Sequence, residues 1–374
     1  MRLQRITAAV GLVLLVPLLA LVSAGGARAS QQAVAVDQTA SPTRPGHVFV
    51  VNIENKGFTR TWGSGSAAAY LAHTLRARGV LLTQYYGTAH HSLGNYLAQV
   101  SGQGPTTQVQ GDCQIYSPMR ATRIGAYQQR VGDGCVYDAK TPTLMKQLDR
   151  ARVSWRGYMQ DMDTRCEHPV LGTPDTTERA RPGHQYAARH DPFVYFRSVT
   201  SHPAYCRAHV VGLGQLTRDL ASVPTTRALS YLTPDLCNDG HDSPCVDGRA
   251  GGLAQVDTWM RTWIPRILAS PAFRKDGMLV ITADESDGPA SDSTACCGEG
   301  ATPNVAQPGM TGPGGGRIGA LVISRWSRPG SSRTVPYNHY GLLATLEQTF
   351  GVGRIGYARL SAVHPFGKDV YNAR

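Results

Sequence analysis

The sequence predicts an α/β protein with a mostly parallel central sheet flanked by helices. Two observations predict this class. Short apolar runs rich in β-branched residues alternate with helical patterns from residue 46 onward, and acidic pairs directly follow two of those runs. Alternation of strand and helix favours parallel strands, because each helix carries the chain back to the same edge of the sheet. We therefore expect a single domain over residues 46–374.

Each predicted element rests on a local pattern. Branched apolar residues predict a strand over 47–53, an amphipathic pattern ending at Gly79 predicts a helix over 67–78, and a second apolar run predicts a strand over 80–86. The same patterns predict helices over 143–151, 256–268 and 339–350 and strands over 153–158, 278–283 and 317–324. Residues 286–316 break the alternation with eight Gly and four Pro, which predicts a long functional loop.

The first 29 residues have the pattern of a secretory signal peptide. A basic start precedes an apolar stretch, and Ala27-Arg28-Ala29 has the form of a cleavage site. An uncleaved membrane anchor is the alternative, but Pro17 inside the stretch and the small residues at its end favour cleavage. We expect cleavage after Ala29, a mobile leader over residues 30–45, and a secreted protein with no stable membrane span.

Basic residues outnumber acidic ones, with 37 Lys and Arg against 26 Asp and Glu, which gives a formal net charge of +11. Only five of the cations are Lys, and Arg binds phosphate and carboxylate through a planar fork as well as by charge. Removal of residues 1–29 takes away three Arg and leaves 11 − 3 = +8. This balance favours anionic substrates or surfaces. A hydrophobic content of 41% excludes disorder for most of the chain.

All eight Cys follow the predicted signal peptide, and an even count in an exported chain favours disulfides. Sequence neighbours give the simplest pairing, namely Cys113 with Cys135, Cys166 with Cys206, and Cys237 with Cys245. Cys296 and Cys297 are adjacent, so a bond between them would close a strained ring. The connectivity stays open, and zinc ligation is the rival interpretation, although no pair has C-x-x-C spacing.

Two acidic pairs stand directly after predicted strands. Glu54-Asn55 follows the first strand and Asp284-Glu285 follows a later one. Ligands of open α/β sheets gather beyond the carboxyl ends of the strands, so these side chains should converge. Oxygen ligands of this kind select a divalent cation such as Ca, Mg or Mn, with Zn as a further choice. The alternative is that these acids cap helices or pair with Arg.

A third motif, residues 90–96, follows the second strand and begins a helical pattern. Ser92 at such a turn can present its hydroxyl as a nucleophile, with helix amides nearby to meet negative charge. Asn95 would face the same end of the helix and could donate to a substrate oxygen. The alternative is that Ser92 only caps the helix. The G-x-S-x-G motif of serine hydrolases is absent.

These motifs resemble the bacterial phosphoesterase family of secreted acid phosphatases and phospholipases C, within the alkaline-phosphatase-like superfamily. The resemblance extends from about residue 46 to residue 351. The motifs that carry it, in family order, are Glu54-Asn55, Ser92 with Asn95 and Tyr96, His190-Asp191-Pro192-Phe193, Asn238-Asp239-Gly240-His241-Asp242, Asp284-Glu285 and Asn338-His339-Tyr340. An alkaline-phosphatase-like fold is what the resemblance implies.

The resemblance also implies roles for particular residues. The metal ligands for one divalent ion would be Glu54, Asn55, Asp284 and Glu285. Ser92 would be the nucleophile, and His190 and His241 would bind the phosphoryl oxygens. Further substrate-binding residues would be His90, Asn95 and His339. His91 and Gly94 stand where short family members carry prolines, which makes the local turn less rigid.

The function expected from this set is a secreted, metal-dependent acid phosphatase that hydrolyses phosphomonoesters through a phosphoserine. The substrate would be a phosphorylated small molecule or a phospholipid head group, and no nucleic acid is expected. A phospholipase C-type phosphodiesterase is the first alternative, but the segment between Asn55 and Ser92 is too short for the additional element of the long phospholipases. Two further alternatives are a glycosidase using Glu54 and Glu285 and a non-catalytic basic surface-binding protein.

Overall fold

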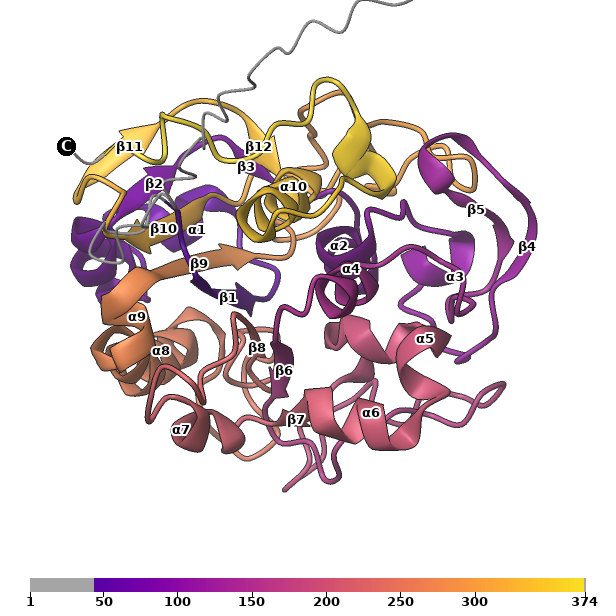
Figure 1. Ribbon diagram of the computed structural model, residues 1–374, viewed down its shortest axis with the longest axis horizontal. Helices are drawn as coiled ribbons and strands as arrows, with labels where there is room; N and C mark the ends of the chain where they lie inside the picture. Colours follow the sequence, from indigo (N-terminus) through magenta and orange to yellow (C-terminus); the bar gives the residue numbers. More distant parts are fainter. Residues whose placement is uncertain (1–43, 373–374) are drawn as a thin grey trace, which may run out of the picture. The chain divides into compact units, whose positions relative to one another are not determined.

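An eight-stranded sheet forms the centre of the protein in the computed structural model, which describes residues 44–372 (Figure 1). The strand order is β11-β2-β10-β9-β1-β8-β6-β7. All neighbouring pairs run parallel except the two that β10 makes with β9 and β2. The predicted α/β class with a mostly parallel sheet is confirmed. The predicted signal peptide and nearly all of the predicted leader lie outside the described residues.

The strands of the central sheet are β1 (His47–Ile53), β2 (Val80–Leu82), β6 (Trp155–Met159), β7 (Val210–Gly212), β8 (Leu229–Thr233), β9 (Gly277–Ala283), β10 (Ala320–Ser324) and β11 (Ser331–Arg333). Two small sheets pair β3 (Tyr85–Tyr86) with β12 (Tyr337–Asn338) and β4 (Arg120–Ile124) with β5 (Arg130–Asp133). The central strands β8, β9 and β10 are buried along their whole length. Burial on both faces explains why β9 and β10 are mostly apolar along their length.

Helices cover both faces of the sheet. They are α1 (Phe58–Trp62), α2 (Ser92–Ser101), α3 (Thr107–Gln110), α4 (Leu144–Arg150), α5 (Arg197–Thr200), α6 (Pro203–His209), α7 (Gln215–Asp219), α8 (Gly252–Ala269), α9 (Pro271–Asp276) and α10 (His339–Phe350). In Figure 1, α8 and α9 lie on one side of the sheet, while α2, α4 and α10 lie on the other. Among the described residues, no helix is long and apolar enough to cross a membrane.

Most predicted elements are present within a few residues of the predicted ends, and the first strand and the last helix have the predicted bounds. The predicted helix over 67–78 differs, since it begins at Tyr70 and is wound as a π-helical turn followed by a 3₁₀ turn. Asp257 explains that start, because its Oδ1 accepts from the backbone N–H groups of Tyr70 (2.6 Å) and Leu71 (3.2 Å). The predicted strand over 80–86 splits into β2 and β3, which belong to different sheets.

The three predicted disulfides are all present, with Cα–Cα distances of 5.8 Å for Cys113–Cys135, 5.5 Å for Cys166–Cys206 and 5.2 Å for Cys237–Cys245. Cys296 and Cys297 also bond to each other, which settles the pairing that the sequence left open. The described chain therefore contains no free Cys.

The segment 286–316 forms neither helix nor strand, and its two ends meet at Gly87. The backbone N–H of Ser286 donates to Gly315 (2.8 Å), that of Gly315 donates to Gly87 (3.0 Å), and that of Gly87 donates to Gly316 (2.9 Å). A Cβ at Gly315 would lie 2.3 Å from the carbonyl oxygen of Ala89. Only glycine permits this approach, which brings the loop against the turn that precedes Ser92.

Glu347 on α10 generates a prediction about the pH dependence of stability. It is fully buried, and its Oε1 accepts from the backbone N–H of Ile355 at 2.9 Å. Burial raises the pKa of this carboxyl from 4.5 to about 8. The folded state therefore keeps a proton that the unfolded chain releases near pH 4.5, so this contribution to stability is complete below pH 4.5 and is lost as the pH rises through 8.

Glu347→Gln keeps the shape of the protonated side chain and removes that loss. We expect urea unfolding to give similar stabilities for variant and wild type at pH 4.5, and a variant more stable by several kcal/mol, roughly 5 at most, at pH 8.5, since the pKa rises from 4.5 to about 8 and each pKa unit corresponds to about 1.4 kcal/mol. An equal difference at both pH values would contradict the assignment.

Candidate active site

The candidate site lies at the carboxyl ends of two neighbouring parallel strands. Glu54 follows β1 and Asp284 follows β9, and these strands pair up to Ile53 and Ala283. The backbone N–H of Asp284 donates to the carbonyl of Ile53 (3.0 Å), and the N–H of Asn55 donates to Oδ1 of Asp284 (2.9 Å). The two predicted acidic pairs therefore meet at one edge of the sheet.

Ser92 is the first residue of α2, and its hydroxyl points at Glu54. The Oγ of Ser92 donates to Glu54 Oε2 at 2.8 Å, while the hydroxyl of Tyr96, one turn further along, donates to Oε1 at 2.5 Å. Asp112 caps the helix by accepting from the N–H of Leu93 at 2.9 Å. With the cap supplied by another side chain, the Ser92 hydroxyl is left to face Glu54.

His190 and Asp239 complete a group of buried ligand atoms with Glu54. Nε2 of His190 lies 3.5 Å from Glu54 Oε2, and its Nδ1 lies 3.1 Å from Oδ2 of Asp239. One ligand atom from each of the three side chains lies within 4.8 Å of the others. The His190 ring stacks on the ring of Tyr96, with centroids 5.4 Å apart.

The residues present fit a divalent cation. Besides the group of Glu54, His190 and Asp239, the Oδ2 atom of Asp284 is buried and has no hydrogen-bond partner. Carboxylate oxygens with one imidazole nitrogen suit Mn²⁺ or Zn²⁺, and carboxylates alone suit Mg²⁺ or Ca²⁺. Asp239 lies in a motif that the sequence analysis quoted, but it was not among the predicted ligands.

The electrostatics of the group also favour a cation. Burial raises the pKa of Glu54 well above its usual value, and the nearby Asp284 and Asp239 raise it further. Burial likewise raises the pKa of Asp239 and of Glu285. Burial lowers the pKa of His190 well below its usual value, followed in size by the effects of Arg189 and His241.

Lys56 is buried beside these acids and donates hydrogen bonds to the backbone. Its Nζ donates to the carbonyl oxygens of Glu54 (2.9 Å), Asn55 (3.1 Å) and Gly240 (2.8 Å). Burial lowers the pKa of Lys56. One ammonium group thus ties the turn after β1 to the turn that carries Asp239.

Glu285, His90 and Asn95 bond to one another at the edge of the site. Glu285 Oε1 lies 2.7 Å from His90 Nδ1, and its Oε2 accepts from Asn95 Nδ2 at 3.1 Å. His90 Nε2 donates to the carbonyl of Asp292 in the long loop (3.0 Å). Asn95 Oδ1 accepts from the backbone N–H of Ala89 at 3.0 Å. These side chains are engaged with the chain itself, an arrangement that fixes the turn presenting Ser92.

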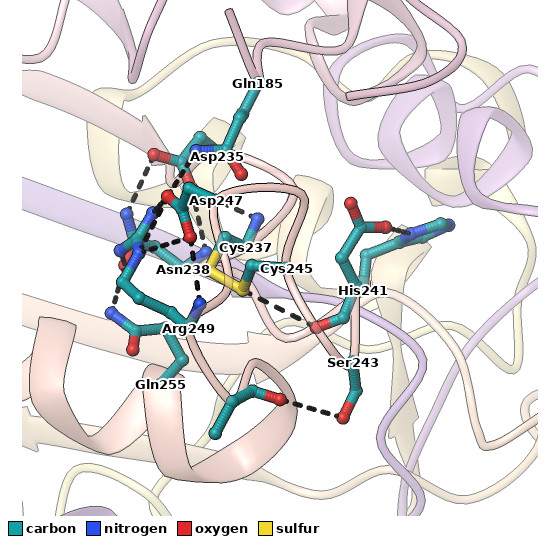
Figure 2. Close-up of a disulfide and its surroundings, with 12 residues drawn as sticks. Gln185, Asp235, Cys237, Asn238, His241, Ser243, Cys245, Asp247, Arg249 and Gln255 are labelled. Carbon is teal, nitrogen blue, oxygen red and sulfur yellow. Dashed lines mark hydrogen bonds and ion pairs between the residues drawn. A yellow bond between two sulfur atoms is a disulfide. The ribbon is translucent and has the colours of Figure 1, made fainter. Parts of the chain in front are cut away.

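His241 lies on a loop closed by the Cys237–Cys245 disulfide, and Figure 2 shows it directed away from the sulfur atoms. Its Nδ1 is 2.8 Å from Oδ1 of Asp242, and its Nε2 accepts from the Arg189 guanidinium at 3.2 Å. The same loop is held by the Asp247–Arg249 ion pair and the contacts of Asn238 visible in Figure 2. The backbone N–H of His241 donates to Asp239 Oδ1 at 2.7 Å.

His339 supports the site by contacting the backbone of Asp284. It begins α10 and is fully buried, and burial lowers its pKa to about 4. Its Nε2 donates to the carbonyl of Asp284 (2.6 Å), and its Nδ1 lies 3.2 Å from the hydroxyl of Tyr85 and from Nε2 of Gln99. These contacts hold the backbone of Asp284 in place, and they leave neither ring nitrogen free for a ligand.

A pocket of about 350 Å³ lies in front of Ser92. Its lining consists of Asn55, His91, Ser92, Gly111, Asp112, Gln114, Glu178, Arg179, Arg189, His241 and Glu285. Sequence reasoning missed the buried Arg189, which donates to the carbonyl of Glu178 at 2.7 Å as well as to His241. Its place beside His190 is the one signal that could have pointed to it.

Comparison with known proteins gives a family match. The model of the "Phosphoesterase family" matches residues 66–353. Over 282 residues the chain is 23% identical to a "Phosphate-repressible acid phosphatase" of Penicillium chrysogenum, covering 75% of this chain and 54% of that protein. It is 23% identical to an "Acid phosphatase" of Aspergillus fumigatus, covering 86% and 61%. The chain thus spans little more than half the length of these fungal relatives.

A "Phosphatidylinositol-3-phosphatase" of Mycobacterium tuberculosis is 25% identical over 313 residues, covering 83% of this chain and 79% of that protein. Among solved structures, a protein in the alkaline phosphatase superfamily from Vibrio parahaemolyticus gives a TM-score of 0.47 at 13% identity, covering 89% of this chain and 72% of that chain. The lipoteichoic acid synthase LtaP of Listeria monocytogenes gives 0.46 at 11% identity, covering 88% and 76%.

The buried acid group predicts that a divalent cation stabilises the folded protein. A cation that binds only the folded state should raise the free energy of unfolding by about 2.7 kcal/mol at 100 times its Kd. Thermal unfolding of chelator-treated protein with Ca²⁺, Mg²⁺, Mn²⁺ or Zn²⁺ measures this. Asp239→Asn should weaken the cation's affinity by about tenfold or more, while Asp247→Asn, in the same loop, should leave it unchanged. Equal responses of both variants would place the cation elsewhere.

Proposed function

Because this chain belongs to the phosphoesterase family, we propose that it is a secreted, metal-dependent acid phosphatase that hydrolyses phosphomonoesters through a phosphoserine intermediate. One observation carries the proposal. The Ser92 hydroxyl, at the start of α2, is hydrogen-bonded to Glu54 within a group of buried ligand atoms and faces a pocket that two Arg side chains line. Family membership removes the glycosidase alternative.

In the first step, Ser92 Oγ attacks the phosphorus atom. The Oγ–P bond forms as the bond from phosphorus to the leaving oxygen breaks, and the proton that the Ser92 hydroxyl loses balances the one that the leaving oxygen takes up. Glu54 accepts the hydrogen bond of Ser92 and so orients the hydroxyl, and the amino-terminal end of α2 favours the negative charge that develops there. Water then attacks phosphorus, the Oγ–P bond breaks, and one proton of the water goes to Oγ, which releases phosphate and restores Ser92.

The divalent cation would be held by Glu54, Asp239, Asp284 and His190, with the Asn55 side chain nearby, and would stabilise negative charge on the transferring group. The remaining phosphoryl oxygens fall to Arg189 and His241. The Arg189 guanidinium has five N–H donors, and its contacts with the Glu178 carbonyl and His241 leave donors for an anion in the pocket.

The relatives support this choice within the family. Two fungal relatives are named acid phosphatases, and the mycobacterial relative is named for a monoester substrate. The four disulfides favour an oxidising compartment, in agreement with secretion. Cleavage after Ala29 remains a prediction, because those residues lie outside the part of the chain that the structure describes.

For the nucleophile, we expect Ser92→Ala to lose activity on 4-nitrophenyl phosphate by roughly a thousandfold or more while its melting temperature stays near that of wild type. Acid-quenched wild type should carry phosphate on the peptide containing Ser92, as detected by mass spectrometry. Ser101→Ala, in the same helix, is the matched control and should keep its activity. Phosphate on another residue would reassign the nucleophile.

For the substrate class, we expect a higher kcat/KM for 4-nitrophenyl phosphate than for bis(4-nitrophenyl) phosphate, by roughly tenfold or more, because a monoester brings nearly two charges at neutral pH and a diester only one. Steady-state rates on both substrates, with chelator as the control, decide between them. Faster cleavage of the diester would favour the phospholipase C-type alternative.

A further inference from the structure

We propose that an exposed apolar turn beside the pocket docks the enzyme on a phospholipid surface. The turn carries Val170 and Leu171, and Ile115 lies beside it; we call these three residues the apolar tip. Their side chains are 71%, 41% and 49% exposed, respectively. The proposal rests on the proposed function and adds a partner to it, the surface of a lipid aggregate.

Backbone pairing places the three side chains on adjoining segments. The N–H of Tyr116 donates to the carbonyl of Thr173 (2.9 Å), and the N–H of Gly172 donates to the carbonyl of Tyr116 (2.8 Å). Ile115 pairs with Pro174 in the same antiparallel bridge. The apolar tip is therefore built from two stretches of chain that pair with each other.

The turn under the apolar tip is fixed. The N–H of Thr173 donates to the carbonyl of Val170 at 3.0 Å, and Gly172 takes a φ of +89°, which glycine adopts freely. The His168 ring stacks on Tyr116, with centroids 5.5 Å apart, and the Cys166–Cys206 disulfide lies just before it. A fixed turn that holds large apolar side chains in water is typical of a binding surface.

The apolar tip is joined directly to the pocket lining. Gln114, the neighbour of Ile115, lines the pocket, and its carbonyl accepts from the N–H of Asp175 at 2.9 Å. Its side-chain Nε2 lies 3.5 Å from Oε1 of Glu178, which also lines the pocket. The apolar tip therefore adjoins the part of the pocket wall that Gln114 and Glu178 form.

A phospholipid surface is the partner that matches both features. It combines phosphate esters, which suit the pocket, with an apolar interior, which suits Val170, Leu171 and Ile115. The exposed charges of the same segment have both signs, with Asp163 and Glu178 against Arg165, Arg179 and Arg181. Insertion of apolar side chains, rather than attraction to anionic lipid, should therefore dominate the binding.

The binding test uses vesicles of phosphatidylcholine alone and measures co-sedimentation of the full chain. We expect wild type to bind, with little change in 0.5 M salt, and the Val170→Asp/Leu171→Asp double variant to bind at least roughly tenfold more weakly. Val335→Asp is the matched control: Val335 is 40% exposed but lies outside both the apolar tip and the pocket lining. No binding by wild type, or equal loss in the control, would overturn the proposal.

The activity test uses phosphatidic acid in the same vesicles and 4-nitrophenyl phosphate in solution. We expect the double variant to lose at least roughly tenfold in rate on the vesicles and to match wild type on the soluble ester, which also shows that it is folded. Equal rates of variant and wild type on both substrates would overturn the proposal that the apolar tip docks on lipid. If the wild type is inactive on the soluble ester, the proposed function is overturned instead. Co-sedimentation with vesicles would then still test whether the apolar tip binds lipid.

A third variant gives a positive signal, which does not depend on a loss of binding or of activity. Val170→Trp should show a blue shift of tryptophan fluorescence, relative to wild type, when phosphatidylcholine vesicles are added. A shift on self-association without vesicles, with a concentration-dependent change in size on gel filtration that the double variant abolishes, would show that a second copy of the chain covers the apolar tip and would overturn the lipid assignment.

Discussion

The candidate site depends on the repulsion among carboxyl groups that the fold buries at the ends of parallel strands. Glu54 and Asp284 arrive there because β1 and β9 are neighbours, and Asp239 arrives on the turn after β8. Close carboxylates with little access to water cannot all be ionised unless positive charge joins them. Lys56 is near, but its ammonium donates to three backbone carbonyls. Protons or a bound cation must therefore neutralise the carboxylates, which is why this site suits a metal ion.

A second layer of side chains keeps the acids in position against this repulsion. His339 and Lys56 hold the backbone on either side, and the bonds among Glu285, His90 and Asn95 fix the turn before Ser92. Several residues that the family resemblance marks for substrate thus contact protein instead. The side chains that we propose to meet a substrate, those of Ser92, Arg189 and His241, all line the pocket.

Local sequence patterns predicted the fold class and most elements, because burial of β1 and β9 on both faces leaves a plain apolar signal. They missed β8, whose Ser230 and Thr233 are buried polar residues that break such a run. The acidic pairs could be placed at the sheet edge from sequence, since parallel neighbours end together. The grouping of Glu54 with His190 and Asp239 could not, because it depends on how separate loops meet in space. The sequence likewise could not identify Arg189 or the apolar tip, because their possible roles depend on how near they lie to the pocket.

Segment 286–316 is closed on Gly87 by backbone hydrogen bonds. Its length can therefore change without changing the geometry of the site. Its ends are tied together, so residues added between them raise the entropic cost of closing the loop by only about 0.6 kcal/mol for each doubling of its length. Met310 is exposed within it and marks a place where such additions meet little resistance. An insertion near Met310 should therefore leave the buried acids and Ser92 where the strands and α2 hold them.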